Sequence, residues 1–117
     1  MEPFRITKRP PLVRIDIEGE LSLEFTDMLK RKLVSILDDP ACHVVAVDLS
    51  ATTFMDSSGI GFLAANATRL RSQGKQFYLL NPSPKVRRIL SLVKLERFFD
   101  RLESDEELDT ILESLTP

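Results

Sequence analysis

The chain has 117 residues, of which 43% are hydrophobic, and a formal net charge of -2 from 16 basic and 18 acidic side chains. Its length predicts one compact domain over residues 1–117, and its nearly balanced charge argues against direct binding to nucleic acid or to an anionic membrane. The single cysteine, Cys42, the lack of an N-terminal apolar run and the lack of any stretch of about 18 apolar residues predict a cytoplasmic protein without a membrane span.

Two strands are predicted at the start of the chain. Residues 4–8 alternate weakly between apolar and polar side chains, and residues 12–18 alternate cleanly. Pro10 and Pro11 separate these runs and cannot donate hydrogen bonds to a ladder, which predicts a turn and an antiparallel first strand at the sheet edge. Gly19 is predicted to end the second strand.

A helix is predicted from Ser22 to about Asp38, because apolar residues recur at helical spacing and Pro40 prevents its continuation. Its apolar stripe consists of Phe25, Met28, Leu29, Leu33, Ile36 and Leu37. The run from Val44 to Leu49 is apolar almost throughout, as is typical of a parallel strand that is covered on both faces. This run is therefore the candidate for the central strand.

The next part of the chain continues to alternate between helix and strand. A helix is predicted to begin near Ser58 and to end at Gly74, and the following strand covers residues 76–80. Ser83 and Pro84 supply an N-cap and a first-turn proline for a third helix. The apolar stripe of this helix consists of Val86, Ile89, Leu90 and Val93.

The chain is predicted to finish with a short strand within residues 97–102 and a fourth helix. Ser104 and Glu107 form a capping box for this helix, and its apolar stripe consists of Leu108, Ile111, Leu112 and Leu115. The order of elements is ββαβαβαβα, which predicts an α/β fold with a mixed sheet and helices packed on the sheet. Right-handed crossovers place the ends of the parallel strands at one edge, where the loops containing Glu20 and Ser22, Asp56 to Ser58, and Asn81 to Ser83 should converge.

The transition from strand to helix near Ser57 and Ser58 presents two serines at the start of a helix. A serine there can cap the helix, and the positive end of the helix dipole favours an anion such as phosphate. We interpret Ser58 as the N-cap. The absence of side chains at Gly59 and Gly61 predicts that a second backbone or the loop of a partner can approach closely.

Catalysis by these serines is disfavoured, because a serine nucleophile needs a base within hydrogen-bond reach. The only histidine, His43, opens the strand at the opposite end, about 20 Å away at ~3.3 Å per residue. Cys42 and His43 are adjacent in an extended segment and point to opposite faces, so they do not form a metal pair. The sequence therefore predicts no catalytic residue, no metal and no cofactor.

Phe62 has two interpretations. Helical geometry places it opposite the stripe of Ile60, Leu63, Ala64, Ala67 and Leu70, on an outer face together with Ser58, Ala65 and Arg69. An exposed aromatic residue near a presented serine is a candidate anchor for a protein partner. The alternative is that Phe62 is buried beneath a neighbouring helix.

Several motifs resemble the bacterial anti-sigma factor antagonists, a family of stand-alone STAS domains. They are Gly19-Glu20-Leu21, Val47-Asp48-Leu49, Phe54-Met55-Asp56-Ser57-Ser58-Gly59-Ile60-Gly61 and Asn81-Pro82-Ser83-Pro84-Lys85-Val86. The similarity extends over nearly the whole chain and implies a STAS-like fold. Many members have an aspartate where this chain has Ser22, so one acidic group of the usual docking edge is absent.

The resemblance implies a role in partner switching. Unphosphorylated members bind an anti-sigma factor that is also a serine kinase and thereby release the sigma factor, and a PP2C-type phosphatase reverses the phosphorylation. The serine after the motif aspartate is the acceptor, which assigns phosphorylation to Ser57. The partner-binding candidates are Glu20, Ser22, Asp56, Ser58, Gly59, Gly61, Phe62 and Arg69. The alternative is a STAS subunit of a larger assembly, such as a lipid transporter or signalling scaffold, that binds constitutively.

Overall fold

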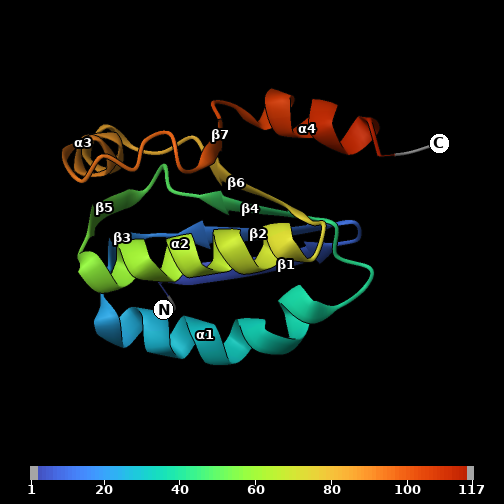
Figure 1. The fold of residues 1–117 in the computed structure, drawn as a ribbon, viewed down its shortest axis with the longest axis horizontal. Coiled ribbons are helices and arrows are strands. Elements are labelled where there is room, and N and C mark those ends of the chain that lie inside the picture. Colours follow the sequence, from blue (N-terminus) through green and yellow to red (C-terminus); the bar gives the residue numbers. More distant parts are fainter. Residues whose placement is uncertain (1–2, 116–117) are drawn as a thin grey trace.

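A computed structural model of the chain describes residues 3–115 and shows a sheet between layers of helices (Figure 1). Five strands form the main sheet in the order β1-β2-β4-β6-β7, and β3 and β5 form a separate two-stranded sheet. The strands are β1 (Phe4–Arg9), β2 (Leu12–Ile17), β3 (Gly19–Leu21), β4 (Val44–Asp48), β5 (Thr52–Met55), β6 (Gln76–Leu80) and β7 (Asp100–Leu102). The helices are α1 (Leu23–Asp38), α2 (Ser57–Ser72), α3 (Pro84–Leu92) and α4 (Asp105–Glu113).

The predicted topology of the main sheet is confirmed. β1 is antiparallel to β2 at the edge, with Phe4 opposite Ile17 and Arg9 opposite Leu12. The other pairs, β2 with β4, β4 with β6, and β6 with β7, are parallel. The strand β4 is central, and its residues Val44 to Val47 are buried. The carboxyl ends of β2, β4 and β6 therefore lie at one edge of the sheet.

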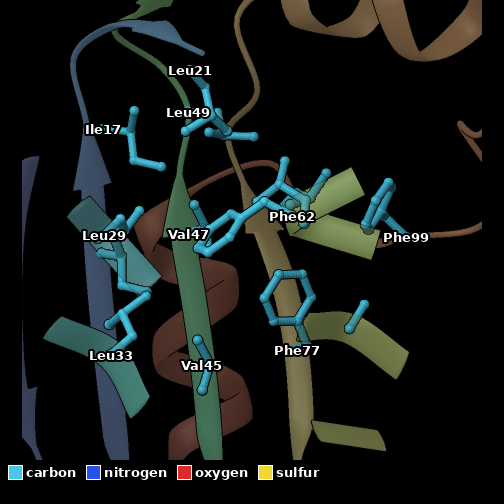
Figure 2. Packing of buried hydrophobic residues seen from close by; sticks show 14 of the residues in the cluster. Ile17, Leu21, Leu29, Leu33, Val45, Val47, Leu49, Phe62, Phe77 and Phe99 are labelled. Carbon is cyan, nitrogen blue, oxygen red and sulfur yellow. The ribbon is translucent and has the colours of Figure 1, made fainter. Parts of the chain in front are cut away.

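Two apolar layers fill the spaces on the two faces of the sheet. α1 and α2 cover one face, where the core includes side chains from β2, β4, β6 and both helices (Figure 2). α4 packs on the other face over a smaller cluster that consists of Leu12, Val44, Ala46, Leu80, Leu102 and Leu108. No helix within residues 3–115 has the length and apolarity that a membrane crossing requires.

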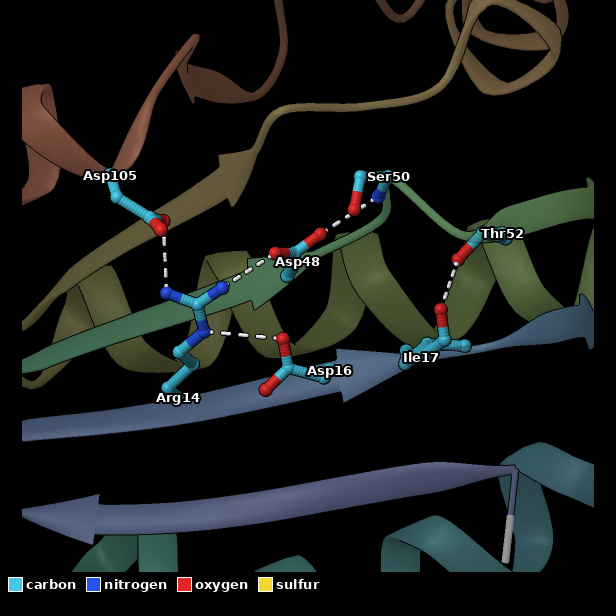
Figure 3. A network of polar contacts seen from close by, with 7 residues as sticks. All are labelled: Arg14, Asp16, Ile17, Asp48, Ser50, Thr52 and Asp105. Carbon is cyan, nitrogen blue, oxygen red and sulfur yellow. Dashed lines mark hydrogen bonds and ion pairs between the residues drawn. The ribbon is translucent and has the colours of Figure 1, made fainter.

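A network of charged side chains joins α4 to the sheet (Figure 3). The guanidinium of Arg14 on β2 donates to Asp16 at 3.2 Å, to Asp48 at 2.6 Å and to Asp105 at 2.9 Å. Asp105 is the first residue of α4, so its pairing with Arg14 fixes the start of this helix above the sheet. The second oxygen of Asp48 accepts from the backbone N–H of Ser50 at 2.8 Å, which orders the turn after β4.

Two features of the fold differ from the prediction. The chain forms the additional pair β3 and β5, and Gly19, which was expected to end the second strand, begins β3 instead with a φ of 85°. This positive φ redirects the chain out of β2 at a position where a side chain would be strained. Three residues of the predicted apolar stripes are exposed. Val93 and Leu115 lie beyond the last residues of α3 and α4, and Met28 lies within α1.

Candidate functional site

The start of α2 presents Ser57 to solvent. Asp56 is the N-cap, and its carboxylate accepts a hydrogen bond from the backbone N–H of Gly59 at 2.9 Å. The prediction that Ser58 caps the helix is therefore wrong, because Asp56, two positions earlier, is the N-cap and already satisfies this donor. Ser57 is the first residue of the helix and is exposed, whereas Ser58 is half-buried. A group attached to Ser57 would lie at the positive end of the helix.

The two glycines of the motif have different surroundings. Gly59 is buried, and a Cβ built on it would lie 2.3 Å from the carbonyl oxygen of Leu21 and 3.0 Å from the Leu21 Cγ. The close approach predicted at Gly59 is therefore made by β3 of the same chain, and Gly59 cannot offer a surface to a partner. Gly61 is exposed, and a Cβ built there would meet no atom within 4 Å. Only Gly61 leaves open space for an incoming molecule.

The small sheet of β3 and β5 brings the loop containing Glu20 and Ser22 next to the loop containing Asp56 to Ser58. Leu21 pairs with Met55, and the backbone N–H of Asp56 donates to the Leu21 carbonyl at 3.3 Å. Ser22, the N-cap of α1, makes no capping hydrogen bond with its hydroxyl and is half-buried beside this junction. Glu20 is exposed and pairs with Phe54 in the ladder. The predicted convergence of these two loops is confirmed.

The loop from Asn81 to Ser83 joins the other two loops at this edge of the sheet through Ser83. Its backbone N–H donates to the carbonyl of Leu49 at 3.1 Å, and its hydroxyl donates to the carbonyl of Thr52 at 2.6 Å. The hydroxyl also accepts from the backbone N–H of Val86 at 3.2 Å and so caps α3, as the sequence predicted. One serine therefore holds both β5 and the start of α3.

Two predicted partner-binding residues lie outside this site. Phe62 is only 5% exposed and belongs to the core beneath α1, so the prediction of an exposed anchor is wrong and the buried alternative is right. α2 packs against the sheet and also against α1, which buries two of its faces. Arg69 is three turns, about 18 Å, along α2 from Ser57 and pairs with Asp38 at the end of α1.

A groove beside the site contains residues that the sequence did not identify. It has a volume of about 450 Å³ and lies between β5 and α3, which are adjacent in Figure 1. Its lining includes Phe54, which is 48% exposed, and Leu92, which is 74% exposed. The spacing of the lining residues on α3 was a usable signal, since positions 85, 88, 89 and 92 share one helical face.

Residues 3–115 contain no group of three or more His, Cys, Asp or Glu side chains arranged to hold a metal ion. His43 is exposed at the start of β4, and Cys42 is buried, where desolvation raises the pKa of its thiol. Ser57 lies beyond the opposite end of β4, so the two parts of a serine nucleophile pair are not together. Ser57 is instead an exposed residue at the start of α2, which follows β5, one wall of the groove.

Most of the chain matches a model of a known protein family. The model described as the STAS domain matches residues 4–108. A curated relative, the anti-sigma F factor antagonist of Lysinibacillus sphaericus, is 23% identical over 106 residues, which cover 91% of this chain and 89% of the relative.

Two solved structures have the same fold at low sequence identity. The anti-sigma factor antagonist SpoIIAA in its unphosphorylated form has a TM-score of 0.80 and 23% identity, covering 97% of this chain and 99% of SpoIIAA. The murine Slc26a9 anion transporter has a TM-score of 0.62 and 20% identity, covering 74% of this chain but only 14% of the transporter. The fold therefore occurs both as a separate small protein and as a part of a much larger one.

Proposed function

Because the chain belongs to the STAS domain family, we propose that it is an anti-sigma factor antagonist whose binding is controlled by phosphorylation of Ser57. One observation carries this proposal: Ser57 is exposed at the start of α2, beside Glu20, Ser22 and Asp56, on a surface that three loops hold in place. The full-length similarity to an anti-sigma factor antagonist supports the same role. Sigma factors act inside the cell, so this role requires a cytoplasmic location.

The unphosphorylated chain binds the anti-sigma factor and releases the sigma factor. Phosphorylation adds about -1.5 to -2 charges at neutral pH. The fold tolerates this charge because it lies at the positive end of α2, but Asp56 and the exposed Glu20 already make the surface acidic. The partner therefore meets a changed charge on an unchanged fold. The kinase activity belongs to the anti-sigma factor, and a PP2C-type phosphatase restores the binding form.

We expect phosphate to be incorporated at Ser57 and not at Ser58, because Ser57 is the exposed member of the pair. The purified chain would be incubated with ATP and, in turn, with each anti-sigma kinase of its source organism, and phosphorylated peptides would be mapped by mass spectrometry. Ser57→Ala should abolish incorporation, and Ser58→Ala is the matched control that should retain it. Incorporation into the Ser57→Ala chain would refute the assignment.

We expect Ser57→Asp to weaken binding of the anti-sigma factor and to leave the fold intact. A carboxylate at the first position of α2 interacts favourably with the helix dipole by about 0.3–1 kcal/mol, so the thermal midpoint should hardly change. Calorimetry would compare the affinities of Ser57→Asp and Ser57→Asn, an uncharged side chain of similar size. If Ser57→Asn weakens binding equally, the loss comes from shape and the proposed charge switch is wrong.

The presence of the fold within the Slc26a9 transporter supports a second candidate function. In this alternative the chain is a subunit of a larger assembly, and the same surface binds its partner constitutively. Neighbouring genes for a kinase-like anti-sigma factor or a PP2C-type phosphatase would favour the switch, whereas transporter genes would favour the assembly. Constitutive binding also predicts that Ser57→Asp and the unmodified chain bind the partner equally well.

A further inference from the structure

We infer that the groove between β5 and α3 binds an acidic segment of the anti-sigma factor that carries an apolar side chain. This inference rests on the proposed function and extends it, because four residues of the groove lining lie outside the motifs: Thr53, Arg88, Ile89 and Leu92. It is lined by Glu20, Thr53, Phe54, Lys85, Arg88, Ile89 and Leu92.

The apolar part of the groove is suited to one inserted side chain. Phe54 on β5 and Leu92 on α3 are 48% and 74% exposed, and Ile89 of α3 also lines the groove. Exposed apolar groups that form one concave patch are typical of interaction sites, whereas scattered ones are not. A segment with a large apolar side chain would remove this surface from water.

The charges around the groove determine which segment fits. Lys85 and Arg88 stand on the α3 side, and neither side chain takes part in an ion pair among residues 3–115. Glu20 is the only acidic residue in the lining, so the groove has an excess of positive charge although the whole chain is slightly negative. Acidic groups beside the apolar side chain of the partner would complement these two cations.

Both walls of the groove are fixed before a partner arrives. The hydroxyl of Ser83 donates to the carbonyl of Thr52 on β5 and caps α3. On the far side of α3, Arg87 donates to the carbonyl of Pro82 at 2.8 Å and to the carboxylate of Glu103 at 3.2 Å. The hydrogen bond between Arg87 and Glu103 lowers the pKa of the Glu103 carboxyl. A preformed groove reduces the entropy that binding must overcome.

The groove also lies close enough to Ser57 to respond to its phosphorylation. Phe54 and Ser57 are three residues apart, so their Cα atoms are separated by at most about 11 Å. This is comparable with the screening length of about 8 Å at physiological ionic strength. A phosphate on Ser57 would therefore repel an acidic segment in the groove as well as any group that contacts the serine directly.

The test uses calorimetry with the full chain and the anti-sigma factor that phosphorylates it. Phe54→Ala should weaken binding about 30-fold, as expected for an aromatic anchor, and Arg88→Glu about tenfold. The matched controls are on α1: Val34→Ala removes apolar surface from a side chain that is 55% exposed, and Arg31→Glu makes the same charge change at an exposed position. Both controls should bind like the unmodified chain, and all four variants should keep its circular dichroism spectrum.

Each other outcome overturns the inference. If Phe54→Ala and Arg88→Glu bind normally while Ser57→Asp does not, the groove is not used and the proposed function stands. If Arg31→Glu weakens binding as much as Arg88→Glu, only the net charge matters. If the unmodified chain forms dimers that Phe54→Ala abolishes, the groove binds a second copy. If no anti-sigma factor binds the unmodified chain, the inference and the proposed function are both wrong.

Discussion

Phe62→Ala should lower the free energy of unfolding by about 3–5 kcal/mol, the usual cost of removing a buried aromatic side chain. Phe62 is 5% exposed and belongs to the same core cluster as Leu33 and Leu37 of α1. Truncation would leave a cavity between α1 and α2 that their backbones cannot fully close. The measurement is denaturant unfolding followed by circular dichroism, with the unmodified chain as reference.

The matched control for this prediction is Phe54→Ala, which removes the same side chain from a position that is 48% exposed. We expect it to cost about 1 kcal/mol or less, the usual range for changes outside a core. Together the two variants separate stability from binding, because Phe62→Ala should affect mainly unfolding and Phe54→Ala mainly the affinity for the partner. Equal losses of stability would contradict the burial of Phe62.

Gly59→Ala should destabilise the chain by about 3 kcal/mol, the upper end of the usual cost of overpacking. The new Cβ would lie 2.3 Å from the carbonyl oxygen of Leu21, which is a backbone atom that cannot rotate away. To remove this clash, the start of α2 must move away from β3. That movement would strain the hydrogen bond from the backbone N–H of Asp56 to the carbonyl of Leu21. We therefore expect the affinity for the anti-sigma factor to fall with the stability.

Gly61→Ala provides a control two residues further along the same helix. No atom lies within 4 Å of a Cβ at Gly61, and alanine is favoured over glycine within a helix by about 0.5–1 kcal/mol. The same substitution should therefore stabilise the chain at position 61 and destabilise it at position 59. A Gly59→Ala chain that unfolds at the same denaturant concentration as Gly61→Ala would show that the contact with Leu21 is not restrictive.

The main features of the fold were predictable from the sequence because they depend on long periodic patterns. Residues 12–17 alternate, and in the structure Val13, Ile15 and Ile17 are buried while Arg14 is half-exposed. The apolar run of β4 indicated a strand covered on both faces. The junction at Ser57 was found because it follows a strand and begins a helix. These signals are local, and no distant contact overrides them.

The features that were missed depend on contacts between distant segments. β3 and β5 have three and four residues, too few for a periodic pattern, and each is ordered by pairing with the other. The exposed anchor predicted at Phe62 assumed that α2 buries a single face, but α1 covers a second one. The N-cap was assigned to Ser58 although Asp56 is an equally suitable type of residue, and only the observed hydrogen bond distinguishes them.

Three chain segments meet at the edge of the sheet, and a partner can recognise their shared surface only in the folded chain. This surface combines residues 20–22, 53–58 and 85–92. They become neighbours only when β3 pairs with β5 and Ser83 joins β5 to α3. A nascent or unfolded chain therefore contains every one of these residues but not the surface that they form. A partner that binds this conformational epitope would not bind incomplete or unfolded chains. The proposed switch would therefore respond only to the concentration of fully folded molecules.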